Sequence, residues 1–291
     1  MTESEAHLGR VPVGDRHPVR VIGVINVSPE SFYAGSVARG REEIARRAAR
    51  LAEEGADIID VGGRSTAPYL ETEVPLEVEI ERVAEAVEAV KSAVDVPISV
   101  DTFRARVAEE ALKRGAEIVN DVTGLRGDQR MLYVLREYEP SLIVCASDDG
   151  VRAGPDPLEK ILRTLRWSLE RLEQIDYDVS RVVVDPCIGF FRRESIPWYL
   201  WDLKVLAGLR RLRELGRPIV VGVSRKSFIG VATGRERPEE RLPGSLAMTA
   251  VALLGGAHAV RTHDVEATRD VARAIEAFAR YGVPLEIKYP R

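Results

Sequence analysis

The chain has 291 residues, 45% of them hydrophobic and 30% charged, which is typical of a globular protein with a sizeable core. Its formal net charge of −4 argues against a surface that binds nucleic acid or an anionic membrane. No apolar run approaches the roughly 20 residues of a membrane-spanning helix, and residues 1–18 lack the apolar segment of a signal peptide. We expect a cytoplasmic protein with a flexible leader at 1–18 and one domain at 19–291.

Short stretches rich in Val and Ile alternate with longer amphipathic stretches along the whole chain. Strands that are buried on both faces have continuous apolar sequences, whereas surface helices repeat apolar residues every three to four positions. These patterns predict eight strands, at 19–27, 57–61, 97–101, 117–120, 141–145, 181–184, 218–221 and 257–260. They predict helices at 42–54, 75–93, 104–114, 157–175 and 265–280.

Glycines punctuate this alternation. Gly55, Gly115, Gly216 and Gly256 each precede a predicted strand by one to three residues, as expected of glycines that end helices. Eight strands joined by helical crossovers within fewer than 300 residues predict an α/β protein, a single-domain (β/α)8 TIM barrel. An open, doubly wound parallel sheet is the alternative.

Polar residues stand where the predicted strands end. In a (β/α)8 barrel the carboxyl ends of the strands surround the active site, so these side chains are candidates for a functional site. Taken singly, each is better explained as a loop residue or a helix cap, but seven of the eight strands share the feature. The candidates are Asn26, Asp60, Asp101, Asn120-Asp121, Asp185, Ser224-Arg225-Lys226 and Arg261-Thr262-His263-Asp264.

The charges of these candidates form two groups. Asp101, Asn120 and Asp185 can accept hydrogen bonds from a heterocycle rich in N–H donors, such as an aminopyrimidine, because buried carboxylates need such partners. Lys226, Arg261 and His263 belong to the last two strands, where barrels commonly bind phosphate. Together the groups predict a polar heterocycle that carries a phosphate or pyrophosphate.

Several blocks of sequence resemble the signatures of the dihydropteroate synthase family of pterin-binding TIM barrels. The resemblance covers residues 20–278, and the blocks occur in the family's order. They are Val24-Ile25-Asn26-Val27-Ser28-Pro29, Asp57-Ile58-Ile59-Asp60-Val61-Gly62-Gly63 with Ser65-Thr66, Ser99-Val100-Asp101-Thr102, Asn120-Asp121, Asp185-Pro186 with Ile188-Gly189-Phe190, Gly222-Val223-Ser224-Arg225-Lys226 and Arg261-Thr262-His263-Asp264.

The resemblance implies an enzyme that joins an arylamine to 6-hydroxymethyl-7,8-dihydropterin pyrophosphate and releases pyrophosphate. From the charge and composition we expect neither nucleic acid nor a membrane as a partner. It also implies Mg²⁺ as cofactor, bound at Asn26, and a homodimer. By the same resemblance, Lys226, Asp101 and Arg261 are the catalytic residues. The implied binding residues are Asp101, Asn120, Asp185 and Lys226 for the pterin, Asn26, Arg261 and His263 for pyrophosphate, and Thr66, Arg64, Phe190 and Ser224 for the arylamine acceptor.

Four departures from the family's pattern affect mainly the acceptor. Residues 65–69 resemble those of archaeal relatives that serve tetrahydromethanopterin-type cofactors, for which the acceptor is a ribofuranosyl-aminobenzene phosphate rather than the 4-aminobenzoate of folate synthesis. Arg64 suits that phosphate, although a loop arginine is more often solvated or paired. The departures are Tyr33-Ala34 for an aspartate, Arg64 for a glutamate, Ala67-Pro68-Tyr69 for an arginine and Val144-Cys145 for Met-His.

Two other functions use the same barrel. One is a pterin-binding protein without synthase activity, which the altered loops leave open. The other is a methyltetrahydropterin-dependent methyltransferase domain, which needs no pyrophosphate site and therefore fits Lys226 and Arg261 less well.

Three smaller features complete the sequence. Cys145 and Cys187 follow neighbouring strands; we expect buried free thiols, with a disulfide as the alternative. Asp148-Asp149 is expected in a solvated loop. Asn26 and Asn120 are the only asparagines, and scarce amides with abundant Arg and Glu are typical of a thermophile.

Overall fold

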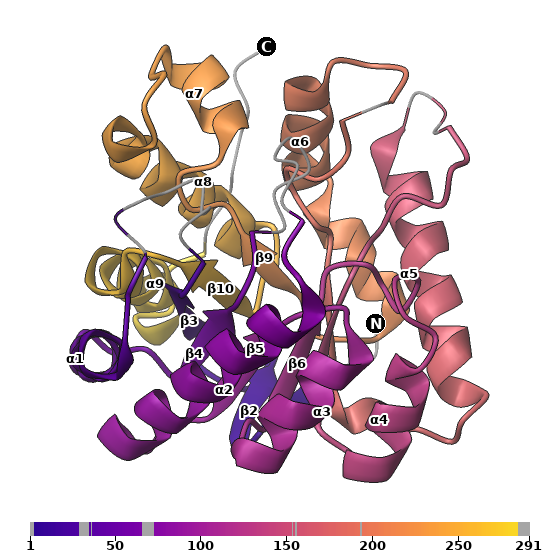
Figure 1. Cartoon of the computed structure of the whole chain (residues 1–291). Helices are drawn as coiled ribbons and strands as arrows, with labels where there is room; N and C mark the ends of the chain where they lie inside the picture. The colour runs from indigo at the N-terminus through magenta and orange to yellow at the C-terminus, as the bar shows by residue number, and fades with distance from the viewer. Residues whose placement is uncertain are drawn as a thin grey trace.

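The computed structural model describes residues 3–28, 35, 37–65, 73–152, 154, 156–192 and 194–284. Eight parallel strands stand at the centre, with helices around them (Figure 1). The hydrogen-bonded order is β8-β7-β6-β5-β4-β3-β10-β9, and a bridge between Val184 and Ile219 joins the two ends of this sheet. The strands are β3 (Arg20–Asn26), β4 (Ile58–Gly62), β5 (Ile98–Asp101), β6 (Ile118–Asp121), β7 (Ser141–Cys145), β8 (Val182–Asp185), β9 (Val220–Gly222) and β10 (Ala259–Thr262).

The closed ring confirms the predicted (β/α)8 barrel and excludes the open sheet. Every predicted strand and helix agrees with an observed one to within two residues at each end. The helices are α1 (Arg41–Glu53), α2 (Leu76–Ala93), α3 (Ala105–Arg114), α4 (Met131–Tyr138), α5 (Pro157–Glu173), α6 (Trp198–Ala207), α7 (Ser227–Thr233), α8 (Leu242–Leu254) and α9 (Val265–Arg280), with short 3-10 turns η2 (Val179–Arg181), η3 (Leu209–Leu215) and η4 (Pro238–Arg241).

The glycines predicted to end helices adopt the left-handed conformation that this role requires. Their φ angles are 98° at Gly55, 107° at Gly115, 64° at Gly216 and 95° at Gly256. Among the described residues, no helix is both long and apolar enough to cross a membrane.

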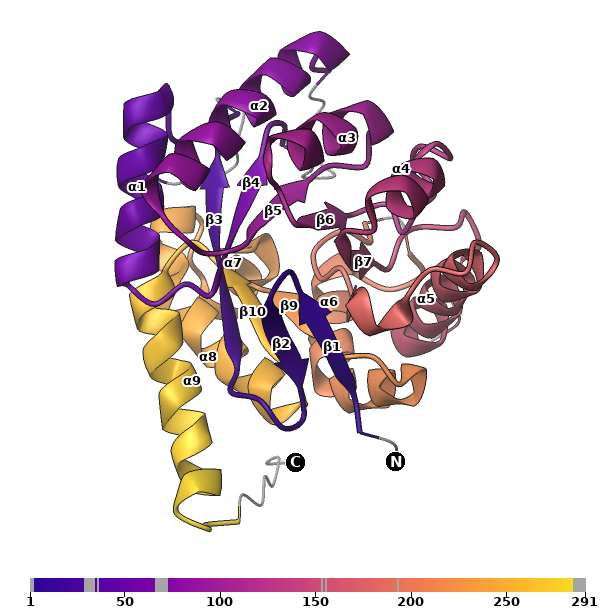
Figure 2. The ribbon, with the colours of Figure 1, turned by 90° about the horizontal axis from the view of Figure 1, so that it is seen from below.

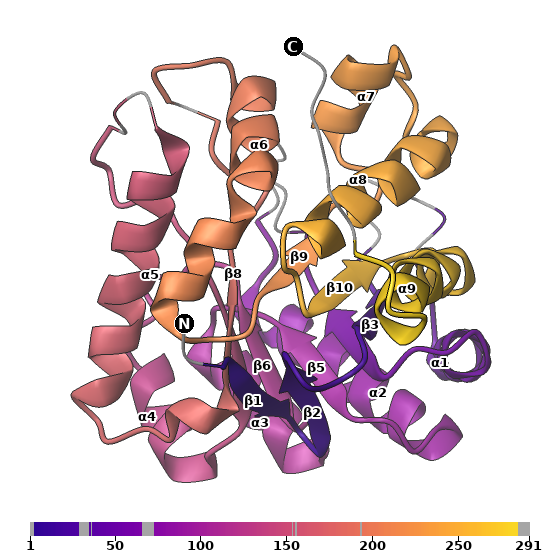
Figure 3. The ribbon, with the colours of Figure 1, turned by 180° about the vertical axis from the view of Figure 1, so that it is seen from behind.

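The amino-terminal segment differs from the expected flexible leader, because it forms an antiparallel β-hairpin. Strands β1 (Glu5–Leu8) and β2 (Val11–Gly14) lie across the bottom of the barrel (Figures 2 and 3). The alternating side chains of Ala6, Leu8 and Val13 are buried against the first inward-facing residues of the barrel strands, such as Ile22. Four-residue strands with a polar outer face carry too short a pattern to stand out in the sequence.

Leu8→Ala tests whether the hairpin stabilises the barrel. Leu8 is completely buried, so its truncation should lower the free energy of unfolding by about 2–4 kcal/mol. The neighbouring exposed residue provides the control, and His7→Ala should change stability by less than about 0.5 kcal/mol. Urea denaturation measures both. Equal stability of the two variants would show that the hairpin does not contribute to the core.

Candidate active site

Arg261 lies at the centre of a buried ionic cluster at the carboxyl ends of the strands. Its Nε donates to Asp60 Oδ2 at 2.7 Å, and its Nη2 donates to Asp101 Oδ2 at 2.9 Å. Asp60 is fully buried, and the Arg261 side chain is 23% exposed. Burial opposes the charge of Arg261, but Asp60 and Asp101 outweigh it and raise the pKa of the guanidinium above its usual value. The cluster thus links β10 to β4 and β5.

The carboxylates of this cluster retain unused hydrogen-bonding capacity. Burial raises the pKa of Asp101, against the opposing effect of Arg261, and the negative charge of Asp60 adds to the rise. Within the described part of the chain, Oδ1 of Asp60 and Oδ1 of Asp101 are buried and accept no hydrogen bond. Asn120 joins the cluster, since its Nδ2 donates to Asp60 Oδ2 at 3.4 Å. Two of the predicted heterocycle-binding residues, Asp101 and Asn120, therefore share one polar cluster.

Asp185, at the end of β8, is the third predicted acceptor of hydrogen bonds. Burial raises the pKa of this carboxyl group, whereas the charges of Lys226 and Arg261 lower it. Its Oδ1 accepts a hydrogen bond from the backbone N–H of Cys187 at 2.6 Å, which fixes the start of the following loop. The charge of Arg261 lowers the pKa of Asp185 and also that of Asp101, so Asp185 belongs to the same polar region as Asp101.

Lys226 immediately precedes α7 and faces the loop after β8. Its Nζ donates to the carbonyl oxygen of Ile188 and lies 5.1 Å from the centre of the Phe190 ring. Gly189 lies between these two contacts with φ of 90°, and a Cβ there would come 3.0 Å from Cδ of Lys226. A side chain at position 189 would therefore displace the lysine.

His263 and Ser224 form the other side of the site. Nδ1 of His263 lies 3.0 Å from Oγ of Ser224, and both residues are buried. Burial lowers the pKa of His263 to about 3, and the nearby charges of Arg261 and Arg225 act in the same direction. The imidazole is consequently neutral at physiological pH. Asn26 ends β3, and its Oδ1 would lie 3.2 Å from a Cβ placed on Gly62.

Arg64 is not solvated, because it is held on the side of α2. Its Nε is 3.8 Å from Oε2 of Glu79, and its guanidinium carbon lies 4.5 Å from the centre of the Phe103 ring. Arg104 pairs with the same oxygen of Glu79 at 2.9 Å. Burial lowers the pKa of Arg64, which the charge of Glu79 opposes. Thr66 and the altered positions 33–34 and 67–69 lie outside the described residues.

The structure adds partners that sequence reasoning did not assign. Asp60 was recognised as a strand end, but its pairing with Arg261 was not predicted. Arg225 is among the strand-end candidates, yet it donates two hydrogen bonds to Asp264 and one to each of two carbonyl groups, which is a structural role. Cys145 and Cys187 are buried free thiols, as expected. The pairings could not be read from the sequence because the partners are 39 to 201 residues apart.

Comparisons with known proteins agree with this geometry. The family model described as pterin binding enzyme matches residues 22–263. The chain is 36% identical to the dihydropteroate synthase of Staphylococcus haemolyticus, over 88% of this chain and 94% of the relative. It is 34% identical to the dihydropteroate synthase of Escherichia coli, over 90% and 92% of the two chains.

Solved structures give the same result. The dihydropteroate synthase of Xanthomonas albilineans with 4-aminobenzoic acid has a TM-score of 0.84 and 35% identity, covering 96% of this chain and 99% of that one. The same enzyme in complex with 7,8-dihydropteroate has a TM-score of 0.80 and 32% identity, with coverage of 94% and 98%. The chain therefore belongs to the dihydropteroate synthase family of pterin-binding enzymes.

Proposed function

We propose that this chain catalyses attack of an arylamine on 6-hydroxymethyl-7,8-dihydropterin pyrophosphate. In this reaction a C–N bond forms at the exocyclic carbon of the pterin, the C–O bond to pyrophosphate breaks, and the amine loses a proton. The observation that carries the proposal is the cluster in which Arg261 bridges Asp60 and Asp101. It brings acceptors for a heterocycle and a cation for an anionic leaving group into one site.

The pterin would bind through its N–H groups to the carboxyl and amide groups at the strand ends. Asp101, Asn120 and Asp185 are buried and supply these acceptors. The unused Oδ1 of Asp101 supports this role, because a buried acceptor without a partner is costly until a ligand satisfies it. Lys226, held by Ile188 and Phe190, would lie beside the ring.

The leaving pyrophosphate would bind at Arg261, His263 and Asn26. As pyrophosphate leaves, negative charge builds up on its oxygen atoms. Hydrogen-bond donors that already point at these atoms lower the activation barrier, because the protein does not need to rearrange. Arg261 supplies a permanent positive charge, and neutral His263 can donate one N–H. Ser224 would position this imidazole through its contact with Nδ1. Lys226, Asp101 and Arg261 would thus contact the reacting part of the pterin.

The residues fit Mg²⁺ that arrives with pyrophosphate rather than one held in a protein cage. Among the described residues, no group of three or more His, Cys, Asp or Glu side chains can hold a metal ion. Mg²⁺ commonly binds to one or two protein oxygens and completes its coordination with substrate phosphates and water. Asn26 would supply such an oxygen beside Gly62. The ion would neutralise charge on the leaving group.

We infer that the acceptor carries a phosphate. Arg64 and Arg104 share the single carboxylate of Glu79, so this group of three charges has a net charge of +1. The Nε of Arg64 is buried and donates no hydrogen bond to any described residue. A ribofuranosyl-aminobenzene phosphate would meet this positive charge, whereas 4-aminobenzoate brings only a carboxylate. Phe190 would pack beside the aromatic ring of either acceptor.

The acceptor is tested by measuring pyrophosphate release from pterin pyrophosphate and Mg²⁺ with each arylamine. We expect the phosphorylated acceptor to have the higher kcat/KM. Arg64→Ala should reduce its advantage several-fold, corresponding to about 1 kcal/mol for a partly screened charge pair. Arg106→Ala, which removes an exposed arginine paired with Glu77, is the control and should leave the ratio unchanged. Equal or faster turnover of free 4-aminobenzoate would instead assign the ordinary folate substrate.

The protonation state of His263 gives a separate prediction for the anion-binding side. Because its pKa is lowered to about 3, the free protein should hold a neutral imidazole from pH 5 to pH 8. NMR of protein with ¹³C-labelled histidine, assigned by loss of a signal in His263→Gln, should show no titration of His263 in this range. A midpoint between pH 6 and pH 7 would contradict the lowered pKa and show that the His263 imidazole can become a cation in the free protein.

We also propose a homodimer. Exposed apolar side chains on α6 and α7, Leu200 and Val231, support an interface at these helices, because large exposed apolar groups often mark contact surfaces.

A further inference from the structure

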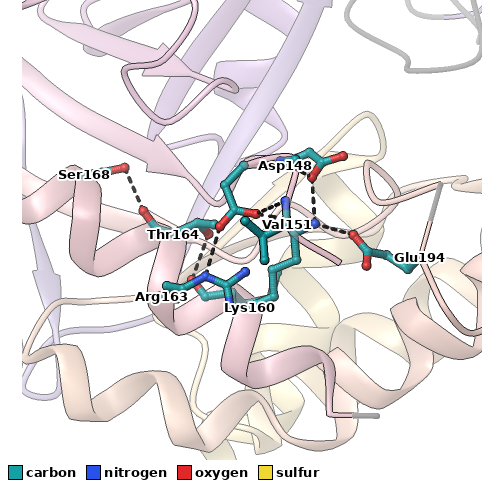
Figure 4. A network of polar contacts seen from close by, with 10 residues as sticks. Asp148, Val151, Lys160, Arg163, Thr164, Ser168 and Glu194 are labelled. Atoms are coloured by element: carbon teal, nitrogen blue, oxygen red, sulfur yellow. Dashed lines mark hydrogen bonds and ion pairs between the residues drawn. The ribbon is translucent and has the colours of Figure 1, made fainter. Parts of the chain in front are cut away.

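Lys160 is a buried lysine that connects two loops at the mouth of the barrel. It belongs to α5, and only 1% of its surface is exposed. Its Nζ lies 2.6 Å from Oδ1 of Asp148 and 3.6 Å from Oδ1 of Asp149, both in the loop after β7. It also donates to Oε1 of Glu194, in the loop after β8 (Figure 4). The Asp148 side chain is exposed, as expected of a solvated loop, and the carboxylates of Asp148 and Asp149 also pair with this lysine.

Glu194 is the most deeply buried of the carboxylates that contact this lysine. The side chain of Glu194 is only 2% exposed, whereas that of Asp148 is 55% exposed. Asp149 has a second cation, since Arg163 donates to its Oδ2 at 3.0 Å. A buried carboxylate that loses its cation is strongly destabilised, whereas an exposed one regains water. Loss of the contact with Lys160 should therefore cost more at Glu194 than at Asp148, and it should loosen the end of the loop after β8.

The loop that contains Glu194 also forms a wall of the candidate active site. Phe191 contacts both Lys160 and Trp201. The centre of its ring lies 5.5 Å from Nζ of Lys160 and 5.1 Å from the ring centre of Trp201. The preceding residue, Phe190, lies next to Lys226. Contacts therefore run from Lys160 through Phe191 to the adjacent Phe190, the residue assigned to the arylamine.

We propose that Lys160 is a positioning residue that supports binding of the arylamine acceptor, because its ion pair with Glu194 holds the loop after β8 with Phe190 against the active site. Lys160 itself touches no reacting group. The inference rests on the proposed function where it assigns Phe190 to the arylamine. It predicts that the Lys160–Glu194 contact governs binding of the arylamine and not binding of the pterin pyrophosphate.

Two matched variants test this, because each removes one carboxylate from the same lysine. Glu194→Ala releases the loop after β8 and should raise the KM for the arylamine about five- to ten-fold, while the KM for pterin pyrophosphate changes less than two-fold. Asp148→Ala acts on the loop after β7 and should change neither KM more than two-fold. Glu194→Gln keeps an oxygen that accepts from Lys160 and should restore most of the arylamine affinity, which a loss of global stability would not predict.

Limited proteolysis supplies a readout that does not need activity. Trypsin should cleave after Arg192 at least five-fold faster in Glu194→Ala than in the unmodified protein or Asp148→Ala. An equal arylamine KM in the two alanine variants, or unchanged cleavage in Glu194→Ala, would overturn the role of Lys160. If the unmodified protein releases no pyrophosphate, the proposed function fails instead, and the cleavage rates still decide whether the contact holds the loop.

Discussion

The pairing of Arg261 with Asp60 and Asp101 is the interaction on which the site depends. A guanidinium that is mostly withdrawn from water needs carboxylate partners, and β4 and β5 supply one each. The barrel makes this possible, because parallel strands end at the same height and bring residues 160 to 201 positions apart into contact. The same guanidinium then places a positive charge directly beside the carboxylates of Asp60 and Asp101.

The proposed function uses this arrangement to hold a neutral heterocycle and an anion in one site. The carboxyl groups of Asp101 and Asp185 favour N–H donors, while the cation beside them favours phosphate oxygens. His263 remains neutral because it is buried among other cations, so it can donate a hydrogen bond without adding charge. The polarity of the site therefore changes over a few ångströms, as a pterin pyrophosphate requires.

The sequence was sufficient for the barrel and for the polar residues that stand at the ends of its strands. Continuous Val and Ile runs and helix-ending glycines, such as Gly115, carry strong local signals, and those signals agree with the closed ring. The hairpin was missed because its alternation, as in Ala6 and Leu8, spans only two short strands. Pairings such as Lys160 with Glu194 were missed because they are made by folding, and no local pattern encodes which charges meet.

The most direct test of the account is calorimetric binding of pterin pyrophosphate and of the corresponding pterin alcohol to the unmodified protein and to Arg261→Ala. If Arg261 joins the heterocycle site to the anion site, the variant should lose at least ten-fold more affinity for the pyrophosphate than for the alcohol. Equal losses for both ligands would contradict the account, because Arg261 would then stabilise only the carboxylates of the pocket.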